Sequence, residues 1–183
     1  MRILDIGCGR SKYAPADPGD TVVGMDCSRQ AGVDVVHNLE DFPWPFSDDE
    51  FELVVAHHIL EHLSDLVATM EEIWRVAKPG ASVRITVPYF SFPGAFQDPT
   101  HKRFFTWKTF DYFLAGVEFN YYSRARFEMG ARRLSAFAKH RRLSALFDPA
   151  INCCPKFYER FFAYIFPAEE LRLELRVVKG KFL

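Results

Sequence analysis

Two glycines and two carboxylates near the amino terminus have the types and the spacing of a site for a ribose-containing ligand. The stretch Leu4-Asp5-Ile6-Gly7-Cys8-Gly9 ends a short apolar run, and Asp26 ends the next one. Glycines after a strand let the backbone approach a ligand closely, and a carboxylate can accept hydrogen bonds from two ribose hydroxyls. These residues therefore predict a ligand site at the ends of two neighbouring strands.

Three histidines, His57, His58 and His62, fall within six residues after a later apolar run. Imidazole nitrogens bind metals or hold hydrogen bonds, and His58 and His62 have the spacing of a shared helical face. No cysteine follows at a ligand spacing. We therefore interpret His62 as a hydrogen-bonding residue, expect no metal ion, and take His57 and His58 as candidates to line a pocket.

The segment 98–105, which reads DPTHKRFF, combines an acid, a base and cations. His101 is a candidate general base, since histidine is the usual side chain for proton transfer near neutral pH, and Asp98 can orient it. Arg103 can hold an anionic group. A capped loop packed by its aromatic residues explains the same pattern, so both interpretations stay open. The candidate acceptor-binding residues are His58, Asp98, His101 and Arg103. The candidate catalytic residues are His101 and His57.

The elements that must position these residues alternate along the first half of the chain. Short apolar runs predict strands at residues 2–6, 21–26, 34–37, 51–56 and 81–87. Apolar residues at helical spacing predict a helix over 67–77. This alternation indicates a mostly parallel α/β sheet with right-handed crossovers, which brings the carboxyl ends of the strands to one edge.

The second half is less regular. It predicts a loop over 88–109, short helices at 108–114 and 143–147, a strand within 124–137, an apolar helix at 157–166 and a strand at 171–178. The apolar helix is too short to span a bilayer, so we interpret it as a lid or as a contact in a homodimer.

Four segments together resemble the class I S-adenosylmethionine-dependent methyltransferases, and especially their broad small-molecule branch, the methyltransferase type 11-like proteins. These segments are LDIGCG, VVGMD, DFPWPFSDDEFELVVAHHILEHL and EEIWRVAKPGASVRITVP, in that order over residues 1–90. The resemblance implies a Rossmann-like sheet with helices on both faces. It also implies that the last strand, LRLELRVV, is inserted antiparallel between the fifth and sixth strands.

The same resemblance implies S-adenosylmethionine as the cofactor and assigns residues to its parts. The loop with Asp5, Gly7, Cys8 and Gly9 borders the methionine part, and Asp26 holds the ribose. The remaining cofactor-binding candidates are Cys27, Asn38 and Leu39 beside the adenine and His57 at the methionine end. The resemblance further implies one methyltransferase domain over 1–183, with a cofactor-binding half at 1–90 and an acceptor-binding half at 91–183 that carries an insertion after the fifth strand.

Two features depart from the family pattern. Ser11 stands where a third glycine is usual, and the short segment between Gly9 and the second strand contains Pro15 and Pro18. A full helix does not fit there, so we expect that helix to be shortened or absent. The chain also begins at its first strand, so we expect one face of the sheet to be thinly covered, or to be closed by the C-terminal half or by a second subunit.

Composition excludes several classes of protein. Hydrophobic residues make up 49% of the chain and charged residues 26%, as in ordinary globular proteins. No apolar run is long enough to predict a transmembrane segment, no signal peptide is evident, and the four cysteines form neither a disulfide framework nor a zinc spacing. We therefore expect a cytoplasmic protein.

Charge is distributed unevenly. Residues 1–90 hold seven Lys and Arg against fifteen Asp and Glu, whereas residues 91–183 hold sixteen against nine. A basic half favours an anionic small-molecule acceptor, although a solvated surface explains it equally well. The alternatives are an RNA methyltransferase that uses the basic half, which we do not favour, and a non-catalytic S-adenosylmethionine-binding protein. DNA-base methylation is disfavoured because the segment Ala56-His57-His58-Ile59 lacks the expected proline motif.

Overall fold

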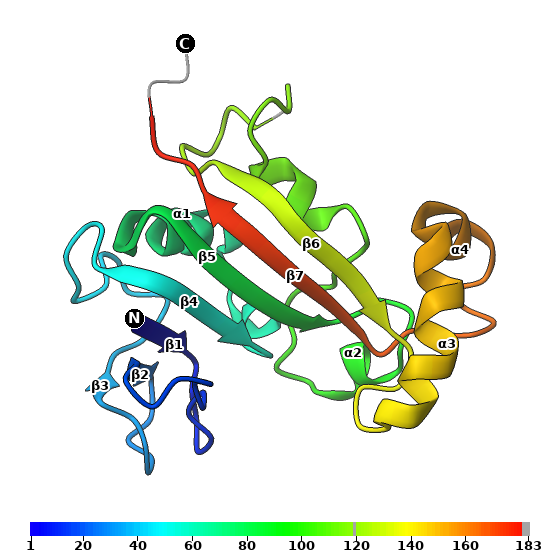
Figure 1. Cartoon of the computed structure of the whole chain (residues 1–183), viewed down its shortest axis with the longest axis horizontal. Helices are drawn as coiled ribbons and strands as arrows, with labels where there is room; N and C mark the ends of the chain where they lie inside the picture. Colours follow the sequence, from blue (N-terminus) through cyan, green and yellow to red (C-terminus); the bar gives the residue numbers. More distant parts are fainter. Residues whose placement is uncertain (119, 181–183) are drawn as a thin grey trace.

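In the computed structural model, which describes residues 1–118 and 120–180, a seven-stranded sheet runs through both halves of the chain (Figure 1). Its order is β3-β2-β1-β4-β5-β7-β6. The strands are β1 (Arg2–Ile6), β2 (Thr21–Asp26), β3 (Val35–Val36), β4 (Phe51–His57), β5 (Ala77–Pro88), β6 (Phe127–Ser135) and β7 (Glu170–Val177).

Strands β1 to β5 pair in parallel, and β7 pairs antiparallel with both β5 and β6. The predicted insertion of the last strand is therefore confirmed. The chain order reverses between β1 and β4, so the crevice at their carboxyl ends is where an open α/β sheet binds its ligands.

The main core lies between the sheet and α1 (Leu66–Val76). Alternate strand residues such as Leu4, Val54 and Val83 supply the sheet side, and Met70 and Ile73 supply the helix side, all fully buried. Asp65 caps α1 by accepting from the amide of Ala68 at 2.9 Å. Helix α1 lies within one residue of the predicted span 67–77. The agreement follows from the regular spacing of its apolar residues along one helical face.

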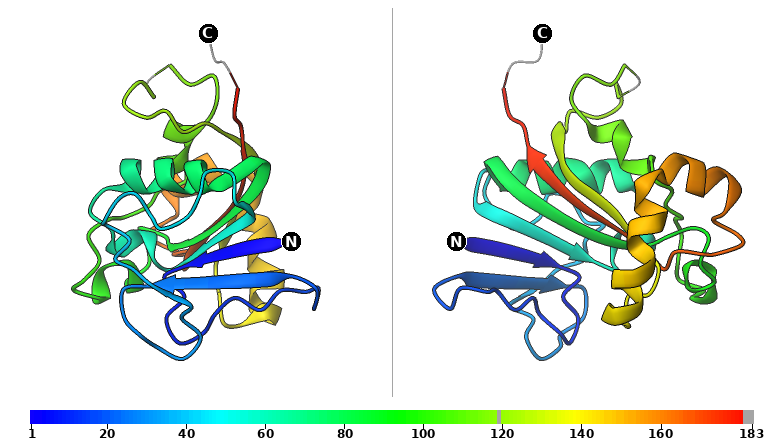
Figure 2. Two further views of the ribbon diagram at one scale, coloured as in Figure 1. Left: turned by 90° about the vertical axis from the view of Figure 1, so that its left-hand side faces the viewer. Right: turned by 45° about the vertical axis from the view of Figure 1, so that its right-hand side comes forward.

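The opposite face of the sheet is thinly covered. Its small apolar cluster contains Ile3, Leu53 and Val55, on which Tyr13 and Val22 pack. Between β1 and β2 the structure has loops and turns in place of a helix, as the two prolines predict. Figure 2 shows α1 on one side of the sheet and α3 (Arg141–Cys153) at its end on the other side.

The second half differs in detail from the prediction. Helix α3 is longer than expected. Asn152 on it hydrogen-bonds to the backbone of Leu134 in β6, and Asp148 accepts from the amide of Ala136, just after β6. Helix α4 (Pro155–Phe161) is shorter than expected, since the chain turns back and the carbonyl of Phe166 accepts from the Tyr158 hydroxyl. The remaining short helices are α2 (Gly94–Gln97), η1 (Leu60–His62) and η2 (Thr109–Phe113).

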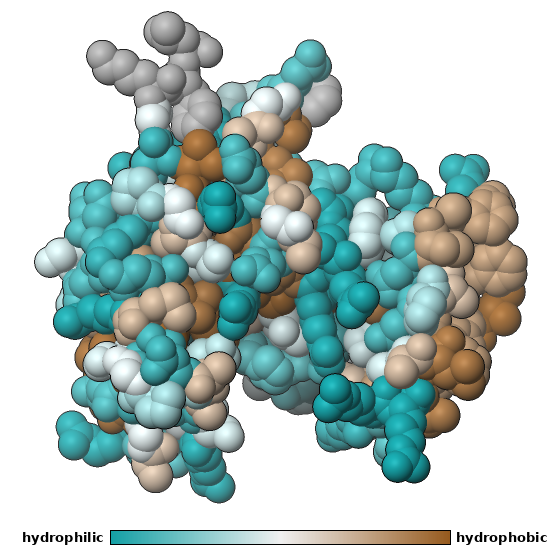
Figure 3. Space-filling model, in the orientation of Figure 1, coloured by the Kyte–Doolittle hydropathy of each residue, from teal (hydrophilic) through white to brown (hydrophobic). Residues whose placement is uncertain are grey.

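Several large apolar side chains on and after α4 are exposed, and Figure 3 shows an apolar surface over this end of the molecule. They are Phe157, Phe161, Phe162, Tyr164 and Ile165. The interpretation of this segment as a lid or a dimer contact stays a prediction. Within the described parts of the chain, none of the helices has the length and apolar character needed to cross a membrane.

Candidate active site

A first cavity of about 570 Å³ lies beside the loop after β1. Four of the predicted cofactor residues line it, namely Asp5, Gly7, Cys8 and His57. Asp5 is buried and accepts from the amide of Tyr13 at 2.7 Å, and its burial raises the pKa of the carboxyl. Burial also raises the pKa of the Cys8 thiol to about 11, with the nearby carboxylates adding to the effect, so the thiol is neutral.

The two glycines of this loop both have left-handed backbone angles, with φ of +67° at Gly7 and +51° at Gly9. A Cβ at Gly7 would overlap the side chain of Ile59, whereas a Cβ at Gly9 would have no neighbour among the described residues within 4 Å. The backbone at Gly9 thus faces open space, which fits close approach by a ligand.

Asp26 holds this loop in place. Its carboxylate accepts from the amide of Gly9 at 2.9 Å and from the amide of Ser28 at 2.9 Å, one at each oxygen. Each oxygen keeps a second lone pair, so the carboxylate can also accept from two ribose hydroxyls. Asp26 and the open space at Gly9 are the features of this chain that fit an S-adenosylmethionine nucleoside.

The other predicted adenine contacts do not line the first cavity. Cys27 is exposed beside Ser28, and the Asn38 side chain accepts from the amide of Glu40 at 3.2 Å. Leu39 is buried in the main core, and its carbonyl accepts from the indole of Trp44. Their roles toward adenine stay predictions.

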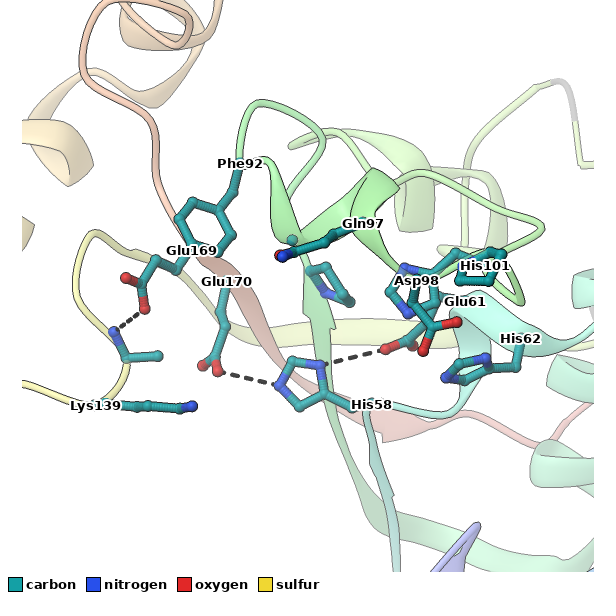
Figure 4. Close-up of a pocket in the computed structure, with 14 residues that line it drawn as sticks. His58, Glu61, His62, Phe92, Gln97, Asp98, His101, Lys139, Glu169 and Glu170 are labelled. Carbon is teal, nitrogen blue, oxygen red and sulfur yellow. Dashed lines mark hydrogen bonds and ion pairs between the residues drawn. The ribbon is translucent and has the colours of Figure 1, made fainter.

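A second cavity, of about 740 Å³, lies at the carboxyl ends of β4 and β5 (Figure 4). It brings together three of the four predicted acceptor residues, His58, Asp98 and His101. Arg103 is not among its lining residues; the guanidinium donates instead to the backbone carbonyls of Leu63 and Ser64.

Sequence reasoning missed the carboxylates of this second cavity. Glu61, Glu169 and Glu170 line it together with Lys139 (Figure 4). Glu61 directly precedes His62, and this adjacency is the local sequence signal that points to it. Glu169 and Glu170 come from the start of the last strand, so only the pairing of β7 with β5 brings them here.

His58 contacts two carboxylates in this cavity, one three residues further along the chain and one on the last strand. Its Nδ1 lies 3.3 Å from Glu61 Oε1, and its Nε2 lies 3.1 Å from Glu170 Oε1. Burial disfavours the imidazolium, but the two carboxylates outweigh this cost and raise the pKa of His58 to about 9. Burial, helped by the His58 cation, lowers the pKa of His57.

The rings of His57 and His58 lie 4.5 Å apart and separate the two cavities, because His57 lines the first and His58 lines the second. A ligand in the cavity beside Gly7 therefore lies next to a ligand in the cavity beside His101. Transfer of a group between two bound molecules requires this adjacency.

Several cations of the second half hydrogen-bond to the protein itself, and among the described Lys and Arg residues of that half Lys139 is the one that lines either of the two cavities. Arg132 donates to the carboxylate of Asp111, Arg126 donates to three backbone carbonyls, and Lys102 pairs with Glu40 at 3.2 Å. The excess of positive charge in the sequence is therefore not concentrated at either cavity.

Known proteins resemble part of this chain in sequence. A family model described as "Methyltransferase domain" matches residues 4–85. A probable S-adenosylmethionine-dependent methyltransferase of Mycolicibacterium smegmatis is 32% identical over 98 residues, which cover 47% of this chain and 37% of that protein. The tRNA (carboxymethyluridine(34)-5-O)-methyltransferase of Arabidopsis thaliana is 34% identical over 95 residues, 46% of this chain and 23% of that protein. The matches thus span less than half the length of these relatives.

Solved structures share the fold over the whole chain. A methyltransferase from Archaeoglobus fulgidus, described as dependent on S-adenosylmethionine, superimposes with a TM-score of 0.61 at 18% identity, covering 96% of this chain and 85% of that one. Residues 4–85 therefore resemble a methyltransferase domain in sequence, and the sheet order is that of the class I S-adenosylmethionine-dependent methyltransferases. The chain has the fold of this class, whose cofactor is S-adenosylmethionine.

Proposed function

We propose that this chain transfers a methyl group to a hydroxyl of a small acceptor that binds in the second cavity. The observation that carries the proposal is the adjacency of two histidine rings, His57 in the lining of the first cavity and His58 in the lining of the second. S-adenosylmethionine supplies an electrophilic methyl group on its sulfonium. The protein contributes mainly by holding the acceptor oxygen in line with that group.

The residues of each half have distinct roles in this proposal. Gly7, Gly9 and Asp26 hold the cofactor, and the second cavity holds the acceptor. The Nδ1 of His101 lies 2.8 Å from the carbonyl of Ala95, and since a carbonyl only accepts, Nδ1 carries the proton. The Nε2 of His101 is therefore free to take the hydroxyl proton as the oxygen–carbon bond forms.

The lining of the second cavity favours an uncharged acceptor over the anionic one that the sequence predicts. The four carboxylates there, Glu61, Asp98, Glu169 and Glu170, outnumber the two cations, Lys139 and the His58 imidazolium. Carboxylates around a cavity disfavour an anion, and they accept hydrogen bonds from hydroxyls. The name of another relative supports oxygen as the acceptor atom: a ubiquinone biosynthesis O-methyltransferase of Pseudomonas entomophila is 28% identical over 102 residues.

RNA is a second candidate acceptor, favoured by the tRNA methyltransferase among the relatives. Arg103, Arg126 and Arg132 donate to carbonyl or carboxylate oxygens of the protein, so these guanidinium groups are less available to phosphates. This supports the small acceptor instead. The two candidates differ in salt dependence, because RNA held by phosphate contacts dissociates steeply as salt rises.

Calorimetry and a transfer assay test the proposal. We expect the wild type to bind S-adenosylmethionine and Asp26→Asn to bind it at least about tenfold more weakly, since the ribose loses charged acceptors. Asp17→Asn, an exposed control outside both cavities, should bind normally. Methyl-labelled cofactor and a panel of uncharged polyols and phenols should give labelled product with the wild type. If the protein fails to bind the cofactor, or labels only RNA, the proposal is wrong.

A further inference from the structure

Three side chains in the second cavity form a cluster with the composition of a metal site. Glu61 and His62 lie on η1, and His101 follows α2. One ligand atom from each lies within 4.8 Å of the ligand atoms of the other two. Figure 4 shows the three side chains gathered on one side of the cavity. The sequence separates His101 from the other two, so this cluster exists only in the folded chain.

The hydrogen bonds of the two imidazoles determine which nitrogens are free. His101 Nδ1 must donate to the Ala95 carbonyl, which leaves a lone pair on Nε2. His62 Nδ1 lies 2.9 Å from Thr100 Oγ1, and that hydroxyl uses its single hydrogen to donate to Asp98 Oδ1 at 2.7 Å. His62 Nδ1 must therefore donate to Thr100, and His62 Nε2 also carries a free lone pair.

This arrangement is the one that metal-binding histidines have. A ligating imidazole usually donates its other N–H to a backbone carbonyl or to a polar side chain, which orients the ring and makes the ligating nitrogen more basic. Here His101 donates to the carbonyl of Ala95. His62 donates to the hydroxyl of Thr100, which in turn donates to the carboxylate of Asp98. The two rings lie 4.7 Å apart.

Glu61 supplies a second, independent observation. Its side chain is 1% exposed, and Oε1 contacts His58. Oε2 is buried and has no hydrogen-bond partner among residues 1–118 and 120–180. A buried carboxylate oxygen without a partner is costly, and a cation in the cluster would remove that cost.

We propose that Glu61, His62 and His101 bind a divalent transition-metal cation such as Zn²⁺ through Glu61 Oε2 and the two Nε2 atoms. Two imidazoles and one carboxylate are a ligand set for Zn²⁺ and for other first-row metals, and three protein ligands leave a position open to the cavity. This proposal differs from the expectation of no metal, which was drawn from the sequence before the position of His101 was known.

The consequence for catalysis rests on the proposed function. With the cation bound, His101 Nε2 is a ligand instead of the base, and the acceptor hydroxyl occupies the open position. A cation lowers the pKa of a bound hydroxyl, so the oxygen is deprotonated without an imidazole base. The released proton passes to solvent through the open side of the cavity.

Metal binding is tested without cofactor or acceptor. Chelator-treated protein is titrated with Zn²⁺ by calorimetry, and with Co²⁺ by absorption, which distinguishes nitrogen and oxygen ligands from thiolates. We expect one site per chain, weakened at least about tenfold by Glu61→Gln, by His62→Ala and by His101→Ala, because each removes one of three ligands. His140→Ala, at an exposed histidine, and the pair Cys153→Ser and Cys154→Ser are matched controls that should bind as the wild type does.

Unfolding curves distinguish the loss of the metal site from a folding defect. Zn²⁺ should raise the Tm of the wild type and of the controls, because a ligand that binds the native state stabilises it. The three ligand variants should unfold cooperatively, with a Tm that the same Zn²⁺ concentration raises less than it raises the Tm of the wild type. No bound metal in the wild type, or equal affinity in Glu61→Gln, would overturn the proposal. Cofactor binding measured in chelator tests the proposed function separately.

Discussion

Gly7 and Gly9 occupy one loop and share a left-handed backbone, yet their surroundings differ. Gly7 is pressed against Ile59, whereas Gly9 faces open space where we place the cofactor. Gly7 therefore allows the loop to pack against Ile59, just before η1, and Gly9 leaves room for the ligand. The family pattern treats the two alike, and only their neighbours distinguish them.

Alanine at each glycine separates these roles. We expect Gly9→Ala to cost about 1 kcal/mol of stability, the usual cost of an alanine in this conformation, and to weaken S-adenosylmethionine binding about tenfold. Gly7→Ala should cost about 2–4 kcal/mol, because the overlap with Ile59 adds to the backbone cost. Gly116→Ala, with φ of +81° and outside both cavities, should match Gly9→Ala in stability and leave binding unchanged. Urea unfolding and calorimetry give the two quantities, and unchanged binding in Gly9→Ala would contradict our placement of the cofactor.

At the scale of elements, a buried ion pair on α1 holds the segment between β3 and β4. Glu72 accepts from Arg75 Nε at 2.8 Å and from the amide of Trp44 at 2.9 Å, and the Trp44 ring is buried in the main core. Burial of Glu72 opposes its charge, but Arg75 and the Trp44 amide outweigh it and lower the pKa of the carboxyl. This pair thus connects the segment between β3 and β4 to α1, which packs on the main core.

We expect Glu72→Gln to lower the free energy of unfolding by about 1–3 kcal/mol at pH 7, since Arg75 loses its buried partner. A carboxyl with a lowered folded pKa stabilises the protein above its unfolded pKa, near 4.5, and loses that contribution as pH falls through the folded pKa. The difference between wild type and variant should therefore shrink below about pH 4.5. Glu71→Gln, on the same helix with a more exposed arginine partner, should cost less than about 1 kcal/mol. A difference that is constant with pH in urea unfolding would contradict this assignment.

At the scale of the whole molecule, the two faces of the sheet are unequal. One face has the main core and α1, and the other has the small cluster of Ile3, Leu53 and Val55 under Tyr13. Tyr13 lies in the segment that replaces a helix, accepts from Arg84 at 3.0 Å and lines the first cavity. The Tyr13 side chain therefore covers part of the sheet face that a helix would otherwise cover.

Removal of that ring tests how much the thin face depends on it. Tyr13→Ala should lower the free energy of unfolding by about 1–3 kcal/mol, because apolar contacts with the small cluster are lost. Tyr13→Phe keeps the ring and should stay within about 1 kcal/mol of the wild type, since only a surface hydrogen bond is lost. Equal losses in the two variants, measured by urea unfolding, would show that the hydroxyl matters and the packing does not.

The sequence by itself determined the strands of the sheet and helix α1, because these elements depend on the periodicity of apolar residues. The antiparallel insertion of the last strand was implied by the resemblance to a family, and periodicity indicated only that a strand lies there. The tertiary structure decided which polar side chains meet. Glu170 reaches His58 from the last strand, Arg103 is held by backbone carbonyls, and His101 joins Glu61 and His62. Such contacts are set by packing between elements far apart in the chain, and no local pattern of residue types records them.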